Sequence, residues 1–402
     1  MKFTHYLWLL PALFGVAAQA DNADTNRFHQ ALADYWQRHP QAQALSAHQI
    51  AADAELDSAR RWLGDSPSLT LGRMENGDGS ETETEFELAL PLPIARGARI
   101  DQSQARGKAL AAEAQYLKLQ MAAELLRADA ELRAQFQRQT LAAQRTQSAR
   151  RLADNAARRT NAGELAQADL WTIEAEQLAA EQALLQAEQA LADAQQRWQQ
   201  LTGQRLTALP PPLAVSPTAS DVERAAAEHP ALQQLAAEHQ RNSAALRAEK
   251  DSWLQGSAVA LQYRREEIST LGEKENFAGI AFSMPLPFGA PRRAAIAEAR
   301  AEQIQSELQF QQREQELTLA IERAQQRLNA LQREQVLLQK RQQLTKQALA
   351  LAEKAFELGE QSLAEFLLTL TRAYDTEADA ITFTQQQQQA YADLIEAQGF
   401  LP

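Results

Sequence analysis

The chain has 402 residues, with 40 basic and 52 acidic side chains, a formal net charge of −12 and no cysteine. The acidic excess argues against nucleic acid as a partner, because a phosphate backbone is bound by concentrated positive charge, and the lack of cysteine excludes disulfides. Aromatic residues make up 6% of the chain, and the abundance of Ala, Gln, Leu and Glu favours long, closely packed helices.

Residues 1–20, MKFTHYLWLLPALFGVAAQA, have the pattern of a secretory signal peptide. Lys2 supplies the positive start, an apolar run follows, and Ala18-Gln19-Ala20 is a small-residue cleavage site. The apolar run is too short to cross a bilayer as a helix, and no other stretch reaches about 20 apolar residues. The sequence therefore predicts an exported protein without a transmembrane helix.

The rest of the chain reads as one repeat written twice. We expect a first repeat at 21–209, a proline-rich linker at 210–220 and a second repeat at 221–402. Each repeat opens with a His-Pro dipeptide, His39-Pro40 or His229-Pro230, at the start of a helix. Residues 162–203 and 358–399 then have the same length, 42 residues, and both end on glycine. Equal lengths between matching glycines indicate a duplicated architecture.

Two exceptionally long segments lack helix breakers. Residues 108–162 and 292–358 contain no Gly or Pro, and at about 1.5 Å per residue they would extend roughly 80 to 100 Å as helices. Gly163 and Gly359 interrupt the pattern, and another breaker-free stretch follows each glycine. The pattern predicts two long helical hairpins with tips near 163 and 359.

Alternating apolar and polar residues predict a β-hairpin in each repeat, at about 66–92 and about 257–286. In the first, Leu88 and Leu90 share a face while Glu85 and Glu87 fall on the other, and ENGDGS is a turn signal. The pattern is typical of transmembrane β-strands, and it equally fits an ordinary half-buried sheet. Both interpretations stay open from alternation alone.

Strand number bears on the membrane interpretation. One chain supplies four such strands, whereas about eight are needed to close a barrel with a filled interior, and a membrane does not tolerate an open sheet edge. If these strands enter a membrane, several chains must share one barrel, and three chains would give twelve strands.

With hairpins, Pro-Leu-Pro triplets at Pro91 and Pro285, long helices and glycine breaks in duplicated order, the chain resembles the TolC-like outer-membrane factors of tripartite efflux systems. The segment PLPFGAPRRAAIAEARAE is particularly similar to their heavy-metal cation efflux branch. The resemblance implies a mostly α fold with a small β part. In it, two β-hairpins per chain form a 12-stranded outer-membrane β-barrel in a homotrimer, and the long helical hairpins form a periplasmic α-barrel.

The same resemblance implies a function. Such a trimer is a passive exit duct in the outer membrane, in contact with outer-membrane lipid and extending into the periplasm. It works with a periplasmic adaptor and an inner-membrane RND pump. It is not an enzyme and needs no cofactor. Heavy-metal cations are the expected cargo, and export of drugs, dyes or a secreted polypeptide (type I secretion) stays open. A periplasmic adaptor or a structural coiled-coil protein is the alternative of a different class.

The junctions between strands and helices are marked by proline. Proline has no N–H to donate to a sheet, and it is well accommodated in the first turn of a helix. We therefore expect each strand to give way to a long helix at four prolines, Pro91, Pro93, Pro285 and Pro287.

By the resemblance, Gly163 and Gly359 lie at the periplasmic tips, and the acid six positions later lines the closed gate. Here those acids are Asp169 and Glu365, so a trimer would carry six carboxylates that respond to cations and pH. An acid near a helix start is also favoured by the helix dipole alone, so both interpretations remain. The candidates for adaptor contact are Arg158, Arg159, Gly163, Glu164, Leu165, Gly359, Glu360 and Gln361.

Site chemistry of other kinds has little support. The histidines form no close pair such as HxxxH, and there is no Cys or Met cluster, so no metal site is expected. We find no nucleophile motif, phosphate loop or paired catalytic carboxylates. The glutamines at 385–389 fit the helical pattern, and we expect them on a helix surface.

Overall fold

The computed structural model describes residues 27–61, 63, 66–75, 81–94, 96–205, 222–251, 256–268, 273–284 and 290–401. The expected signal peptide, the linker at 210–220, and Pro285 and Pro287 lie outside the described residues. None of the helices in the described ranges is both long and apolar enough to span a membrane. The predicted fold class, mostly α with a small β part, is confirmed.

The chain divides into two compact units. The first comprises the described residues of 1–39, 117–229 and 317–402, and the second those of 40–116 and 230–316. Two helices, α3 (Arg96–Asn161) and α7 (Ala290–Glu357), each contribute to both units.

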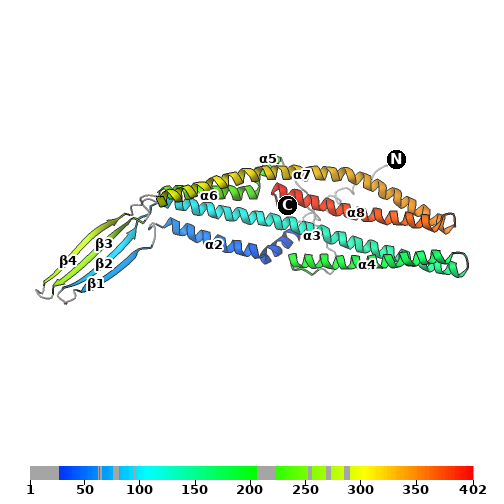
Figure 1. Ribbon diagram of the computed structural model, residues 1–402, viewed down its shortest axis with the longest axis horizontal. Helices are drawn as coiled ribbons and strands as arrows, with labels where there is room; N and C mark the ends of the chain where they lie inside the picture. The colour runs from blue at the N-terminus through cyan, green and yellow to red at the C-terminus, as the bar shows by residue number, and fades with distance from the viewer. Residues whose placement is uncertain are drawn as a thin grey trace, which may run out of the picture. The chain divides into compact units, whose positions relative to one another are not determined.

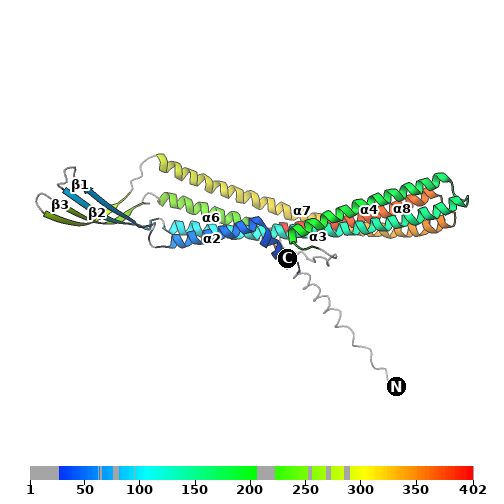
Figure 2. The same ribbon diagram turned by 90° about the horizontal axis from the view of Figure 1, so that it is seen from below.

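The second unit contains a four-stranded antiparallel sheet, drawn from two views in Figures 1 and 2. Its order is β1-β2-β3-β4, so the hairpin of the first repeat pairs directly with that of the second through β2 and β3, where Phe86 lies opposite Tyr263. The strands are β1 (Ser68–Glu75), β2 (Glu81–Pro91), β3 (Ala258–Ile268) and β4 (Glu273–Ser283). The helices α2 (Pro40–Arg60) and α6 (Pro230–Asp251) belong to the same unit and begin where the His-Pro dipeptides predicted helix starts.

The first unit is helical and contains both long hairpins. Its elements are the helical residues 27–38, the distal parts of α3 and α7, α4 (Gln167–Thr202), α5 (Val222–Glu228) and α8 (Leu363–Gln398). The second helices of the two hairpins, α4 and α8, are both 36 residues long. Each ends at a glycine with positive φ, Gly203 at 68° and Gly399 at 80°, whose N–H donates to the carbonyl four residues earlier. This αL cap needs a residue without a Cβ, which explains the matching glycines of the sequence.

Within this unit the helices lie side by side in the order α4, α3, α8, α7 (Figure 1). The Thr146 hydroxyl of α3 donates to the Ala180 carbonyl of α4 at 3.0 Å. On its other side, Arg127 of α3 forms an ion pair with Asp393 of α8 at 2.6 Å. A core cluster that includes Leu331 and Phe383 joins α7 to α8. The outer helices of the layer are therefore α4 and α7.

Candidate functional site

The turns at the hairpin tips have the same backbone geometry. Gly163 has φ 79° and Gly359 has φ 76°. At the first tip the N–H of Gly163 donates to Thr160 and that of Glu164 to Arg159, both at 2.9 Å. At the second, Gly359 and Glu360 donate to the carbonyls three and five residues earlier, at 3.1 and 2.8 Å. This is the Schellman motif, in which a left-handed glycine satisfies the last carbonyls of a helix.

The two tips pack against one another. Leu363, the first residue of α8, packs on a cluster of α3 and α4 that includes Ala153 and Ile173. The rings of Phe356 and Phe366 stack at 4.7 Å, and the Arg159 guanidinium lies 5.9 Å from the Phe356 ring centroid. The tips therefore form one surface of the helical unit rather than two separate ends.

The residues expected to contact an adaptor differ in exposure on this surface. Five are exposed: Arg158, Gly163, Glu164, Gly359 and Glu360. Three are half-buried: Arg159, which forms an ion pair with Glu164 at 3.7 Å, Leu165, which packs on the α3–α4 cluster, and Gln361. The exposed set has one basic side chain, Arg158, and two acidic ones, Glu164 and Glu360, beside the two turn glycines. Its role in binding an adaptor stays a prediction.

The two expected gate residues lie in the first turns of α4 and α8, but in different surroundings. The Glu365 carboxylate accepts from the Ser362 N–H at 3.2 Å and from the Ser362 hydroxyl at 2.9 Å, and the Ser362 oxygen accepts from the Glu365 N–H. This reciprocal capping box satisfies helix-end donors. The sequence signal for this cap is the S-x-x-E pattern at 362–365.

The environment of Asp169 is less constrained. The residue before α4 is Ala166, which provides no side-chain cap, and Asp169 is half-buried. Within the described ranges, no hydrogen bond or ion pair holds the Asp169 carboxylate. The structure therefore favours the helix-start interpretation for Glu365 and leaves Asp169 available for another role.

The strand-to-helix junction of the first repeat is more gradual than expected. Pro91 is the last residue of β2 and stands opposite Ala258, and the Leu92 N–H donates to the Ser257 carbonyl at 2.9 Å. Pro93 follows the strand and α3 begins at Arg96, so Pro93 precedes the helix instead of lying in its first turn. The first proline ends the strand, and a short connection separates it from the helix.

One face of the sheet is apolar over the rows that contain Leu69 and Leu71 and becomes charged and polar toward the β1–β2 turn, where Arg73, Glu75, Arg265, Glu267 and Lys274 lie. Paired residues of neighbouring strands point to the same side, and one such row contains Leu71, Phe86, Tyr263 and Ala278. Many of these side chains are exposed in the single chain, for example Leu71 at 72% and Ile280 at 77%. The whole apolar set comprises Leu69, Leu71, Phe86, Leu88, Leu90, Val259, Leu261, Tyr263, Ala278, Ile280 and Phe282.

The opposite face is acidic. Arg264 is its one basic side chain among the described strand residues, and it pairs with Glu83 at 3.3 Å and with Glu266 at 2.9 Å. Gln262 donates to Glu87 at 2.8 Å. The carboxylates of this face are Glu81, Glu83, Glu85, Glu87, Glu266, Glu273 and Glu275. Such an excess of carboxylates produces a negative potential over this face.

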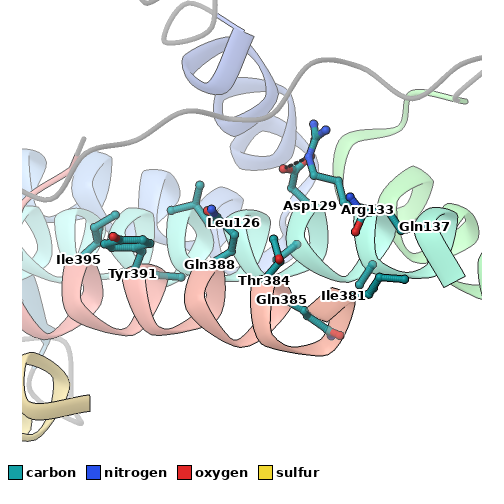
Figure 3. A pocket seen from close by; sticks show the side chains of 13 residues that line it. Leu126, Asp129, Arg133, Gln137, Ile381, Thr384, Gln385, Gln388, Tyr391 and Ile395 are labelled. Atoms are coloured by element: carbon teal, nitrogen blue, oxygen red, sulfur yellow. Dashed lines mark hydrogen bonds and ion pairs between the residues drawn. The ribbon is translucent and has the colours of Figure 1, made fainter. Parts of the chain in front are cut away.

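A pocket of about 240 Å³ lies between α3 and α8 in the helical unit (Figure 3). On its α3 side Asp129 and Arg133 form an ion pair at 2.7 Å. Gln385 lines the α8 side, accepting from Arg138 at 2.9 Å and donating to Glu131. Gln386 and Gln388 are exposed on the helix surface, as expected for the glutamine run, whereas Gln385 is half-buried and joins α8 to α3. No group of three or more potential metal ligands occurs in the described parts of the chain.

Comparison with known proteins agrees with the fold of long helical hairpins and a four-stranded sheet. Residues 222–399 match the family model of outer membrane efflux proteins. By sequence similarity the chain matches no curated protein. The fold is similar to a membrane protein from Pseudomonas aeruginosa, with TM-score 0.78, 17% identity, and 92% of this chain and 93% of that chain covered.

Two further solved structures share the fold. The CmeC outer membrane channel of Campylobacter jejuni has TM-score 0.76 and 12% identity, with 92% of this chain and 85% of that chain covered. The outer membrane protein VceC of Vibrio cholerae has TM-score 0.76 and 14% identity, with 93% and 96% covered. The family match and these structures support the resemblance to outer-membrane factors and agree with the predicted outer-membrane localisation. The heavy-metal branch stays a prediction.

Proposed function

We propose that three copies of this chain form the outer-membrane duct of a tripartite efflux system. Their sheets would join into one 12-stranded barrel and their helical units into a periplasmic α-barrel. The tips would engage a periplasmic adaptor and an inner-membrane RND pump. The duct itself is passive, and the pump supplies the energy.

The observation that carries this proposal is the four-stranded sheet. It has an apolar face, an acidic face and two edges, β1 and β4, that each have a single neighbour within the described sheet. An edge exposed to hydrocarbon leaves backbone donors and acceptors unpaired at a cost of several kcal/mol each. Pairing β1 of one copy with β4 of the next removes every edge and places the apolar face toward lipid. Three of the four strands have 11 residues, a length suited to a tilted membrane strand.

The cargo we propose is cationic, with heavy-metal ions as the leading class. In the closed barrel the acidic face would line the lumen, where carboxylates raise the local concentration of cations and repel anions. A duct conducts ions without tight ligands, so cation passage needs no metal site. Multidrug export through the same duct is the alternative.

The periplasmic gate we propose depends chiefly on Asp169. Its carboxylate has no described partner, whereas that of Glu365 is bound in the capping box. Three Asp169 side chains brought together at the tips would repel one another unless a cation or a proton neutralised them. Opening would follow when adaptor and pump draw the tips apart.

The first experiment is electrical. Purified full-length protein in detergent should have the mass of a trimer, and in planar bilayers under a KCl gradient its reversal potential should report cation preference. Glu85→Gln/Glu275→Gln should reduce that preference, since both carboxylates lie on the acidic face. Glu75→Gln is the matched control on the opposite face of the same sheet. A monomeric protein without conductance would refute the duct, and an unchanged reversal potential in the double variant would refute the acidic lumen.

The second experiment addresses the cargo. A deletion strain is grown on panels of metals and drugs and complemented with wild type, Asp169→Ala or Glu365→Ala. Sensitivity confined to metals is expected. Sensitivity to drugs alone would contradict the metal cargo and indicate that the duct exports drugs. Increased leakiness is expected for Asp169→Ala and not for Glu365→Ala, which tests the division of roles at the tip.

A further inference from the structure

We propose that the first repeat contains a binding pocket for the phosphodiester group of a phospholipid, at the junction of the sheet with α2 and α3. This inference rests on the membrane placement of the proposed function, and it adds a ligand site that lies within one chain.

The pocket lies where α2 ends and α3 begins, beside the sheet (Figure 1), and has a volume of about 320 Å³. The last turns of α2, the connection after β2 and the first two turns of α3 form its walls. Ala59, Leu63, Pro93 and Ile94 give it an apolar side. All of its lining residues belong to the second unit, so the pocket is contained in one part of the chain.

The charged side chains of the lining are mostly basic. Arg61, Arg96 and Arg99 line the pocket together with one carboxylate, that of Glu55, which Arg106 binds at 2.5 Å. A guanidinium group presents five N–H donors in a planar fork that matches the oxygens of a phosphate. A chain with a net charge of −12 thus concentrates positive charge at this pocket, and the complementary ligand is an anion.

One of the three arginines supports the fold. Arg96, the first residue of α3, donates to the Arg60 carbonyl at the end of α2. In the second repeat Arg292, in the first turn of α7, donates to the Lys250 carbonyl in the last turn of α6 at 2.9 Å. A basic group that binds the last carbonyls of a helix is favoured by the helix dipole. The presence of this contact in both repeats indicates that it holds the shorter helix against the long one.

The other two arginines occur in the first repeat alone. The spacing between the two capping arginines carries Arg99 to Ala295, and the spacing between the two carbonyls that they bind carries Arg61 to Asp251. The duplicated architecture thus forms in the second repeat without a basic residue at either position. Arg61 and Arg99 therefore serve a ligand of the first repeat rather than the fold.

The level of the pocket fits a phospholipid head group. Pro93 lines it, and Leu90, three positions earlier, belongs to the last paired row of the apolar face on the helix side. Three extended residues cover about 10 Å, which is about 7 Å along the membrane normal for a strand tilted by about 45°. The head-group region extends about 5–7 Å beyond the hydrocarbon on each side of a bilayer. In the proposed barrel the arginines therefore lie at the level of the lipid phosphates on the periplasmic side.

Native mass spectrometry of the purified full-length protein tests the site. Phosphatidylglycerol is titrated against wild type in detergent, and diacylglycerol with the same acyl chains is the control ligand without a phosphodiester. Phosphatidylglycerol should bind about tenfold more tightly, since the guanidinium groups donate charge-assisted hydrogen bonds to it. Arg61→Gln/Arg99→Gln should remove this preference. Arg96 is left unchanged because its substitution would also remove the contact with α2.

Lys108→Gln/Arg300→Gln is the matched control variant. It removes the same charge from exposed positions of α3 and α7 that do not line the pocket, and it should keep the preference for phosphatidylglycerol. Equal loss in both double variants would indicate a general charge effect and overturn the pocket. Equal binding of phosphatidylglycerol and diacylglycerol by wild type would overturn it as well.

Competition distinguishes a lipid head group from a free phosphate, which shares its chemistry. Inorganic phosphate should leave phosphatidylglycerol bound to wild type, because the apolar side of the pocket holds the lipid in addition. Displacement of phosphatidylglycerol by inorganic phosphate would indicate a site for a soluble anion and overturn the lipid site.

The same spectra report the oligomeric mass, which separates failure of this inference from failure of the proposed function. A trimer that binds phosphatidylglycerol equally in wild type and both double variants would overturn the pocket and leave the duct intact. A monomer whose phosphatidylglycerol binding depends on Arg61 and Arg99 would support the pocket and overturn the duct.

Discussion

The glycines at the two hairpin tips give the most direct test of the structure. Gly163 and Gly359 have φ values of 79° and 76°, which a residue with a Cβ adopts at a cost of about 1–2 kcal/mol. A Cβ added at either position would meet no atom within 4 Å. The expected cost of Gly163→Ala or Gly359→Ala is therefore conformational alone, and it should be the same at both tips because the hydrogen bonds are the same.

Amide hydrogen exchange followed by mass spectrometry measures this cost locally. The Glu164 amide, which donates to the Arg159 carbonyl at 2.9 Å, should exchange about 5–30 times faster in Gly163→Ala, as follows from 1–2 kcal/mol. Gly163→Asn should have a smaller effect, since Asn adopts the left-handed conformation more readily.

Gly107→Ala is the matched control. Gly107 lies inside α3, its φ is not positive, and an added Cβ there also meets nothing within 4 Å. This substitution should stabilise the helix by about 0.5–1 kcal/mol. Gly107→Ala is expected to slow amide exchange around position 107. If Gly163→Ala left amide exchange at the tip unchanged, or slowed it, the left-handed turn would be refuted.

Three further predictions test other parts of the helical unit. Ser362→Ala removes the capping box of α8 and should lower the stability of its first turn by about 1 kcal/mol, measured by exchange at the α8 amides. Ile321→Ala, at a side chain with 0% exposure, should destabilise by about 2–5 kcal/mol in denaturant unfolding, whereas Val336→Ala, at 66% exposure, should change stability by less than about 0.5 kcal/mol. Burial, together with a hydrogen bond to a carboxylate, raises the pKa of Tyr35 above its usual value of about 10. The native state thus favours the neutral phenol, so its stabilising contribution is complete below pH about 10 and is lost as pH rises further. Thermal melts of wild type should fall more steeply than those of Tyr35→Phe in that range, and parallel curves would contradict the assignment.

The sequence alone determined the features that depend on neighbours along the chain. A left-handed turn admits glycine with least strain, so Gly163, Gly203, Gly359 and Gly399 marked helix ends before any contact was known. A period of two assigned the faces of the strands, because side chains alternate across a sheet. The duplicated spacing predicted two equal second helices, and α4 and α8 indeed have the same length.

Tertiary structure decided what depends on partners distant in sequence. The pairing of β2 with β3 joins the two repeats into one sheet, and the ion pair of Arg127 with Asp393 sets α3 beside α8. Neither contact has a local sequence signal, because residues more than a hundred positions apart meet only when whole elements pack. The same packing leaves Tyr374 and Ile381 half-buried while Leu178 and Leu344 are exposed, although the spacing of these apolar residues is alike. Heptad spacing in the sequence shows that a helix has an apolar side. Whether another helix of the same chain packs on that side depends on the order in which the helices lie.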